Sequence, residues 1–473
     1  MALKISTRQS VNPCIKYFML ECQILNFRIA FLEKNFIKIF LGVLLMCGCC
    51  VASADSTKSA LYKYDELVLE NGLQVISIPM QNGSKVVDIN IFYKVGSRNE
   101  VLGKSGIAHI LEHLSFKSTK HLKAGEFDEI VKGFGGNNNA STSFDYTRYF
   151  IKSHKNNLDK SLSLFADMMQ NLSLKDAEFQ PERSVVLEER LWRTDNNPMG
   201  YLYFRLFNTA FVTHSYHWTP IGFIDDIKSW NIKDIRDFYK TFYQPQNAII
   251  VVAGDVKSSE VFSIAKKYFG SIKNSRQIPQ VSVKEPPQDD RRFIDIRREN
   301  QEVELYALAF KIPNFEHKDQ IALSILSHIL SNGKSSILVQ NLVYKNKLAQ
   351  SIYAYNMELK DDGLFIIMAS GNENIKAESL QDSILAQLEL VKQGQIDDSS
   401  VEKAKINIKA DFIYGLENSS SVASLYGGYF ARGNIKPLLE YEENFSKISV
   451  SDLVAVANKY FDVNRSTTIF LRK

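Results

Sequence analysis

The stretch from His109 to His113 sets two histidines four positions apart, with Glu112 next to the second, in the order H-x-x-E-H. Side chains four apart lie one turn above each other on an α-helix, so a helix would aim both imidazoles at one point beside the carboxylate. A helix suits the surrounding sequence, because residues 103–106 form a loop between two glycines and residues 107–116 contain neither proline nor glycine. The stretch therefore predicts a helix that carries two metal ligands and a base, as in zinc hydrolases.

Two less specific interpretations of the motif stay open. The chain has eight histidines among 473 residues, so the spacing would be a rare accident if it arose by chance. Surface histidines with satisfied hydrogen bonds on an amphipathic helix are the ordinary structural alternative. A catalytic zinc ion needs a third protein ligand and an open position for water, so a further ligand elsewhere in the chain would favour the metal site.

A second helix is predicted to begin near Leu174, and it carries glutamates that could supply this ligand. Glu182 and Glu189 stand seven residues apart, which places them on one helical face. Glu188 points about 100° away from Glu189 on such a helix, and we interpret it as a solvated charge. A thiolate ligand is excluded for the folded body, because all five cysteines lie within the first fifty residues: Cys14, Cys22, Cys47, Cys49 and Cys50.

With these residues the chain resembles the pitrilysin/insulinase family of zinc metallopeptidases. In that family H-x-x-E-H is followed by a glutamate ligand at the spacing found here, with 75 residues between His113 and Glu189. The resemblance implies one Zn²⁺ ion per chain, held by His109, His113 and Glu189, with Glu112 as the catalytic base. Glu182 matches a second family glutamate seven positions before the ligand, which implies that it supports His113 in catalysis.

Residues 135–142 are similar to a further family segment, G-G-x-x-N-A-x-T, an exposed strand on which substrate is thought to lie. Asn139 and Ala140 match its N-A positions, which implies that they bind substrate. An uncovered strand edge pairs with any extended peptide through main-chain hydrogen bonds, so recognition would be largely independent of sequence. Taken alone, a glycine-asparagine run is a turn signal. His217 lies in another family-like segment, and we expect it to have a packing or hydrogen-bonding role.

The family pattern breaks in the second half of the chain. Active single-chain or homodimeric relatives carry an arginine and a tyrosine seven positions apart, where this chain has Val343 and Gln350. That pair helps to hold substrate and the developing oxyanion, which valine cannot do. Divided family members, such as the mitochondrial processing peptidase, place these elements on separate chains, so we expect a homologous partner subunit. The alternative is a homodimer in which Tyr344, Tyr353 or Lys345 substitutes for the pair.

The first 54 residues are predicted to be a leader. Two lysines precede the apolar run 39–52, and Ala52–Ala54 offers a small-residue cleavage site. This pattern is typical of a bacterial secretory signal peptide, so we expect export, most simply to the periplasm. The apolar run is short for a bilayer span, and an uncleaved inner-membrane anchor is the alternative.

Charge and hydropathy exclude other functions. Residues 1–54 hold six Lys/Arg and two Asp/Glu, a net charge of +4 that equals the formal charge of the whole chain. The remaining body is therefore neutral, and nothing in its charge supports nucleic-acid binding. No second apolar stretch is long enough for a membrane span, so none is expected in the mature chain.

The chain reads as a divergent internal repeat. A strand over 86–95 leads to the zinc-motif helix over 108–113, and a strand over 302–311 leads to a helix over 327–332 with a similar sequence. The metal residues are missing from the second copy, so we interpret His328 as a relic on a structural helix.

The predicted fold is α+β, with two homologous halves that are each a mainly antiparallel sheet covered by helices. A proline-rich polar stretch is the best linker. The expected organisation is a leader (1–54), a zinc-bearing catalytic domain (55–278), a linker (279–291) and a degenerate repeat domain without a metal site (292–473).

The expected function is that of an exported zinc-dependent endopeptidase subunit, which hydrolyses peptides or unfolded polypeptides. A non-catalytic scaffold or assembly subunit of the same fold, like the core proteins of respiratory complexes, is the alternative.

Overall fold

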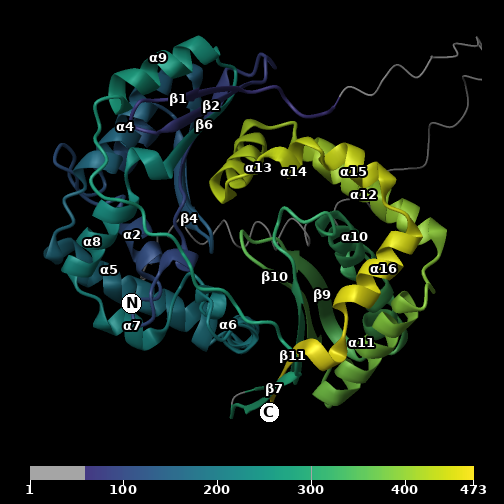
Figure 1. Ribbon diagram of the computed structural model, residues 1–473. Helices are drawn as coiled ribbons and strands as arrows, with labels where there is room; N and C mark the ends of the chain where they lie inside the picture. The colour runs from purple at the N-terminus through teal and green to yellow at the C-terminus, as the bar shows by residue number, and fades with distance from the viewer. Residues whose placement is uncertain (1–58, 300) are drawn as a thin grey trace, which may run out of the picture. The chain divides into compact units, whose positions relative to one another are not determined.

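The computed structural model describes residues 59–299 and 301–473, which are built around two β-sheets (Figure 1). The predicted leader lies outside the described residues. Within them, none of the helices combines the length and the apolar composition that a membrane span requires. The strands are β1 (Asp65–Val68), β2 (Gln74–Pro79), β3 (Val86–Tyr93), β4 (Asn137–Thr142), β5 (Thr147–His154), β6 (Ala248–Gly254), β7 (Arg292–Arg297), β8 (Leu305–Ile312), β9 (Ala349–Met357), β10 (Gly363–Gly371) and β11 (Ser466–Arg472).

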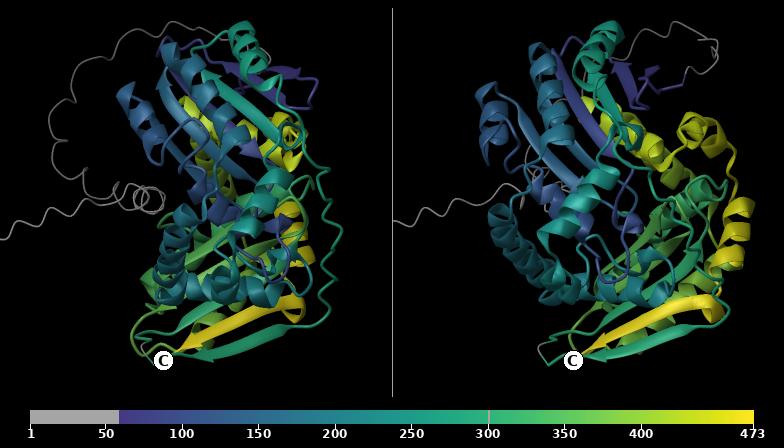
Figure 2. Two further views of the ribbon diagram at one scale, coloured as in Figure 1. Left: turned by 90° about the vertical axis from the view of Figure 1, so that its left-hand side faces the viewer. Right: turned by 60° about the vertical axis from the view of Figure 1, so that its left-hand side comes forward.

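Both sheets are mainly antiparallel, and each contains one parallel pair. The first sheet has the strand order β1-β2-β6-β3-β5-β4, with β2 and β6 parallel. The second has the order β7-β11-β8-β10-β9, with β7 and β11 parallel, and Figure 2 shows the C-terminal strand β11 in yellow beside β7. Because helices cover both sheets, the predicted fold of two mainly antiparallel sheets with helical layers is confirmed.

The two halves repeat one topology, as the sequence predicted. Without β1, the strands of the first sheet correspond in order to those of the second. Helices fall at matching points along the chain. In the first half they are α2 (Ile107–Leu114), α3 (Glu126–Gly133), α4 (Leu158–Asn171), α5 (Asp176–Arg190), α6 (Pro198–Ala210), α7 (Ile224–Ser229), α8 (Ile232–Phe242) and α9 (Ser258–Phe269). In the second they are α10 (Gln320–Ser331), α11 (Ala377–Lys392), α12 (Asp398–Gly415), α13 (Ser419–Arg432), α14 (Lys436–Leu439), α15 (Tyr441–Lys447) and α16 (Val450–Tyr460).

The central strands β3 and β8 bury both of their faces. In β3, Ile89 and Ile91 point to a core shared with the helices of the first half. Phe92 points to the opposite face and joins a separate core with residues of α13. Strand β8 behaves in the same way, because Leu308 faces the helices of its own half while Ala307 faces the other side.

Each half covers the second face of the other half's sheet with one helix. Helix α13 packs on β3 and β6, and the corresponding helix of the first half, α6, packs on β8 and β11. Gly427 permits a close approach of α13, because a Cβ there would lie 2.1 Å from Cε2 of Phe92. Two of the four cores therefore contain residues of both halves, which couples the folding of one half to the other.

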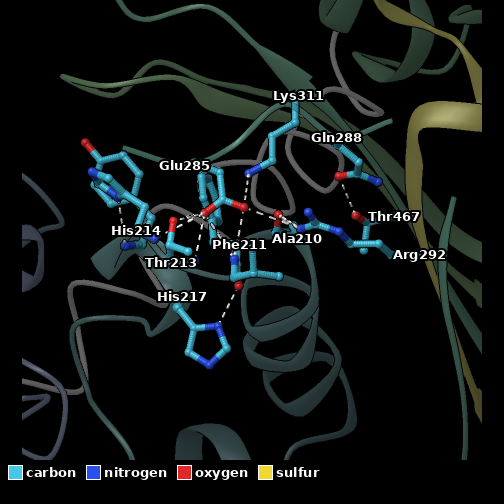
Figure 3. A network of polar contacts seen from close by, with 12 residues as sticks. Ala210, Phe211, Thr213, His214, His217, Glu285, Gln288, Arg292, Lys311 and Thr467 are labelled. Atoms are coloured by element: carbon cyan, nitrogen blue, oxygen red, sulfur yellow. Dashed lines mark hydrogen bonds and ion pairs between the residues drawn. The ribbon is translucent and has the colours of Figure 1, made fainter. Parts of the chain in front are cut away.

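Residues 271–291, which connect the halves, contain neither helix nor strand. Glu285 fixes this segment to the chain that follows α6 (Figure 3). Its carboxylate accepts hydrogen bonds from the backbone N–H groups of Val212, Thr213 and His214, at 3.0 to 3.1 Å. Nζ of Lys311 in β8 lies 3.8 Å from the same carboxylate. The segment predicted as a linker is thus held by hydrogen bonds to the chain that follows α6, and by charge to β8.

Candidate metal centre

The helix that carries the H-x-x-E-H motif begins at a tightly packed loop. Gly106 has φ +83°, and a Cβ there would lie 2.6 Å from the carbonyl oxygen of Ile221. Glu100 accepts hydrogen bonds from the backbone N–H groups of Gly106 and Ala108 and from Nε1 of Trp218, each at 2.8 Å. These hydrogen bonds satisfy N–H groups that are unpaired at a helix start, while burial raises the pKa of Glu100 to about 8. Glu100 therefore fixes the start of α2, a role that its sequence context did not reveal.

Three donor atoms from α2 and α5 converge beside this helix. Nε2 of His109 lies 3.3 Å from Nε2 of His113, and Oε2 of Glu189 lies 3.7 and 3.4 Å from these two atoms. A tetrahedral zinc ion with bonds of about 2.0 to 2.1 Å sets its ligand atoms roughly 3.3 Å apart. Among the described residues, this is the one group of three such side chains that could hold a metal ion. The triangle fits a zinc ion with one open position.

The charges around the triangle favour a cation. Burial lowers the pKa of His109 to about 4, so this imidazole is neutral at pH 7. Burial alone would also lower the pKa of His113, but hydrogen bonds to Glu182 and Glu189 outweigh it and raise the pKa to about 10. The carboxylates thus stabilise positive charge at the point where the sequence predicted the metal.

Glu182 supports His113 from behind. Its Oε1 lies 2.8 Å from Nδ1 of His113, the ring atom that points away from the triangle, and its Oε2 lies 2.6 Å from Nζ of Lys117. Burial alone would raise the pKa of Glu182, but the hydrogen bonds from His113 and Lys117 outweigh it and lower the pKa to about 2. The carboxylate is therefore ionised and fixes the orientation of the ring. Glu188, by contrast, is exposed, as expected for a solvated charge.

Glu189 is held in a similar way by a cation. Nη1 of Arg193 lies 3.1 Å from Oε1, while Oε2 faces the two histidines. Arg193 belongs to the π-helical turn η3 (Leu191–Asp195), which directly follows α5. Burial alone would raise the pKa of Glu189, but the charge of His109, which is protonated at the low pH where Glu189 titrates, and the hydrogen bond from His113 outweigh it and lower the pKa to about 2. Glu189 is thus an ionised ligand with one oxygen directed at the triangle.

Sequence reasoning missed Lys117 and Arg193, although a spacing rule could have identified Arg193. Each stands four residues after a predicted ligand, Lys117 after His113 and Arg193 after Glu189. Residues four apart are neighbours on a helix surface. Lys117, however, lies beyond the end of α2 and its acidic partner Glu182 is on α5, so only the folded structure shows this contact.

Glu112 lies beside the triangle and contacts the predicted substrate strand. Its Oε2 accepts a hydrogen bond from the hydroxyl of Thr142, with 2.6 Å between the oxygens. Burial raises the pKa of Glu112, which makes the carboxylate a stronger base. Thr142 ends β4, the strand that contains Asn139 and Ala140. The structure therefore brings together the predicted base and the predicted substrate strand.

Strand β4 forms one edge of the first sheet. It pairs with β5 on one side, and on its other side no strand of the described residues follows. Asn139 stands opposite Phe150 and Ala140 opposite Tyr149. Ala140 packs against the core between the first sheet and the helices of its own half. The edge of β4 away from β5 is therefore not paired with a strand of the described residues, and the backbone N–H of Ala140 donates to Oδ1 of Asn139 at 2.9 Å.

The other residues considered from sequence lie apart from the triangle. Nδ1 of His217 donates to the carbonyl oxygen of Phe211 at 2.6 Å, which is a structural contact (Figure 3). His328 lies on α10 in the second half. Val343 packs against the core between the second sheet and the helices of its own half. Gln350 is exposed on β9, the edge strand of the second sheet.

The family comparisons cover both halves of the chain. Residues 75–214 match the family model of insulinase (peptidase family M16), and residues 229–408 match that of the peptidase M16 inactive domain. The chain is 53% identical over 442 residues to the protein of Helicobacter pylori named zinc protease PqqE, covering 93% of this chain and 100% of that protein.

Two further proteins extend the comparison. The crystal structure of a protease from Helicobacter pylori has a TM-score of 0.86 at 55% identity, covering 87% of this chain and 100% of that chain. The probable mitochondrial-processing peptidase subunit beta of Arabidopsis thaliana is 27% identical over 408 residues, which cover 83% of this chain and 75% of that protein. With its two family matches and a relative of 53% identity along the whole of that protein, the chain belongs to the insulinase family of peptidases, M16.

Proposed function

We propose that this chain is the zinc-bearing subunit of an exported endopeptidase that hydrolyses peptides or unfolded polypeptides. The observation that carries the proposal is the triangle of His109, His113 and Glu189, whose donor atoms lie 3.3 to 3.7 Å apart. Glu112 lies next to the triangle and contacts an edge strand through Thr142. A metal site, a base and a peptide-binding edge are the three elements that peptide hydrolysis by a metallopeptidase needs.

The chain's own residues would divide the chemistry as follows. When bound, zinc polarises the peptide carbonyl and activates water for attack. The carboxylate of Glu112 accepts a proton from the attacking water and returns it to the leaving amine. Its buried position suits this role, because burial raises its pKa and so strengthens it as a base. Thr142 holds one oxygen of Glu112, which limits rotation of the carboxylate.

Strand β4 would hold the substrate by strand addition. The backbone at Asn139 and Ala140 lies at a sheet edge, and main-chain hydrogen bonds bind extended peptides with little regard to their sequence. A folded domain cannot offer such a stretch without opening. The proposed substrates are therefore extended peptides and unfolded chains.

The proposed partner is a homologous chain that supplies the missing polar pair. Val343 cannot stabilise an oxyanion as arginine does, and it packs against the core between the second sheet and its helices. A related protein of Arabidopsis carries the name of a processing peptidase subunit beta, which fits a divided enzyme. A homodimer with Tyr344, Tyr353 or Lys345 in this role is the alternative. The other alternative, a non-catalytic scaffold subunit, is favoured only by the replacement of the arginine and tyrosine with Val343 and Gln350.

The test measures zinc and peptidase activity on the same preparation. The purified chain should contain about one zinc ion per chain. It should cleave an unfolded protein poorly alone, and strongly when co-expressed with a homologous chain that carries the arginine and tyrosine. A chelator should abolish cleavage, and added zinc should restore it. A purified chain without zinc would contradict the proposal of a zinc peptidase. Strong activity of the isolated chain would contradict the proposal that a partner subunit is needed.

Export is tested separately by cell fractionation. The proposed cleavage after Ala54 gives a mature chain that begins at Asp55 in the periplasm. N-terminal sequencing of the fractionated protein measures this directly. An intact leader in the inner membrane would support the anchor, and an intact leader in the cytoplasm would contradict export.

A further inference from the structure

The two glutamates at the metal centre share one arrangement. In Glu182, Oε1 faces His113 and Oε2 faces Lys117. In Glu189, Oε2 faces the two histidines and Oε1 faces Arg193. Each carboxylate thus has one oxygen directed at the centre and one bound by a cation from outside.

We propose that Lys117 and Arg193 are positioning residues that hold these two carboxylates in place and thereby set the affinity of the centre for zinc. The inference rests on the proposed function, because it concerns the same metal site. Each cation contacts a glutamate and would act through the glutamate that it holds.

Lys117 would act on the orientation of His113. Its Nζ lies 2.6 Å from Glu182, whose other oxygen lies 2.8 Å from Nδ1 of the histidine ring. The side chain of Lys117 is 33% exposed and that of Glu182 is 12% exposed, so the pair is partly shielded from water. Partial shielding makes an ion pair stronger than one on the open surface. Without Lys117, the carboxylate gains freedom to rotate, and the ring that it orients becomes less fixed.

Arg193 would act on the binding mode of Glu189. With Oε1 bound to the guanidinium at 3.1 Å, only Oε2 faces the triangle, so the carboxylate is set to bind a metal through one oxygen. The backbone of this turn is itself fixed. A Cβ at Gly200 in α6 would lie 1.9 Å from the carbonyl oxygen of Arg193, so the first turn of α6 packs directly against it. Without the guanidinium, both oxygens of Glu189 can turn inward.

A matched control for Lys117 lies elsewhere in the same half. Nζ of Lys104 also lies 2.6 Å from a carboxylate, that of Asp234, with exposures of 32% and 24%. This pair joins the loop before α2 to the start of α8, and Asp234 contacts neither histidine of the motif. A general effect of losing a partly shielded ion pair should therefore appear equally in Lys104→Met and Lys117→Met.

The experiment measures zinc affinity by competition with a chromogenic chelator on the full chain. Outer partners of metal ligands typically contribute 10- to 100-fold to affinity, so Lys117→Met and Arg193→Met should each bind zinc roughly tenfold more weakly. Lys117→Arg should restore most of the affinity, and Lys104→Met should leave it unchanged. Thermal unfolding of the metal-free proteins verifies folding, and Lys117→Gln replaces Lys117→Met if the latter does not fold.

A second readout separates the two cations. In the cobalt-substituted protein, Arg193→Met should weaken the visible absorption bands, because a second oxygen of Glu189 raises the coordination number. Lys117→Met should leave band intensity nearly unchanged once the site is saturated. Zinc affinities of both methionine variants within about twofold of the wild type would overturn the inference. A wild-type chain that binds no zinc would instead contradict the proposed function itself.

Discussion

Thr142 of β4 donates its hydroxyl hydrogen to Glu112 of α2, with 2.6 Å between Oγ1 and Oε2. The contact links the edge strand proposed to bind substrate with the carboxylate proposed to move the proton. This hydrogen bond therefore ties the position of the proposed base to that of the proposed substrate strand. Neither residue needs a long loop to reach the other, because α2 and β4 pack together.

Glu112→Gln should abolish cleavage while zinc stays bound. The substitution keeps the shape of the side chain and removes the proton acceptor, a change that costs about 10²- to 10⁴-fold in rate. Zinc content and cleavage of an unfolded protein are measured with the partner present. Glu188→Gln is the control, since Glu188 is an exposed glutamate on α5 and should retain full activity. Full activity in Glu112→Gln would contradict the mechanism.

Thr142→Val should move the acid limb of the pH–rate profile to higher pH. Burial raises the pKa of Glu112, and the hydrogen bond from Thr142 partly offsets this by stabilising the ionised form. Loss of the hydroxyl raises the pKa further, so more alkaline solution is needed to ionise the base. The measurement is kcat/KM against pH for both proteins. An acid limb at unchanged or lower pH would show that the hydroxyl does not act on Glu112.

His113→Ala should lose zinc, and Glu189→Ala should do the same. Each substitution removes one of the three proposed zinc ligands. Loss of a residue that only supports a ligand lowers metal affinity by up to roughly 100-fold, so loss of a ligand should lower zinc affinity by more than this. His217→Ala is the control, because His217 binds the carbonyl of Phe211 and should keep its zinc. Metal analysis after dialysis measures all three. Retention of zinc in either ligand variant would remove that residue from the site.

Asp361→Asn should destabilise the chain at pH 7 more than at low pH. Burial alone would raise the pKa of Asp361, but hydrogen bonds from His214 and Arg98 outweigh it and lower the pKa from 3.8 to about 2. Because the pKa of Asp361 is lower in the folded than in the unfolded protein, its ionised carboxylate stabilises the fold above pH 4. This stabilisation is lost as the pH falls toward 2. Because the side chain is 38% exposed, we expect only about 1 kcal/mol. Denaturant unfolding at pH 7 and pH 3 measures the difference, and an equal loss at both would contradict the assignment.

Gly427→Ala should destabilise the protein, whereas its neighbour Gly428→Ala should not. A Cβ at Gly427 would lie 2.1 Å from the ring of Phe92, but at Gly428 the nearest atom is the hydroxyl of Tyr146 at 3.4 Å. Overpacking costs about 1 to 3 kcal/mol. Alanine in a helix is favoured over glycine by about 1 kcal/mol, so Gly428→Ala should be neutral or stabilising. Urea unfolding compares the two, and equal stabilities would contradict the packing of α13 on the first sheet.

The features predicted correctly from the sequence are those that depend only on the spacing of nearby residues. Residues four or seven apart share a helical face whatever surrounds them, so the H-x-x-E-H helix and the face of Glu182 and Glu189 followed from spacing. The repeat followed from matching runs of strand and helix. The strand orders did not follow, because pairing of β2 with β6 joins residues far apart in the chain.

The amino-acid sequence by itself determined the helices of the metal centre, the internal repeat and the residue types that could act there, since all three depend on short-range periodicity. Only the tertiary structure decided which further side chains hold the residues of the metal centre in place. Lys117 meets Glu182 from the bend that follows α2, Thr142 meets Glu112 from a strand, and α6 and α13 each cover the sheet of the opposite half. Such contacts arise from packing over long sequence separations, which no local spacing encodes.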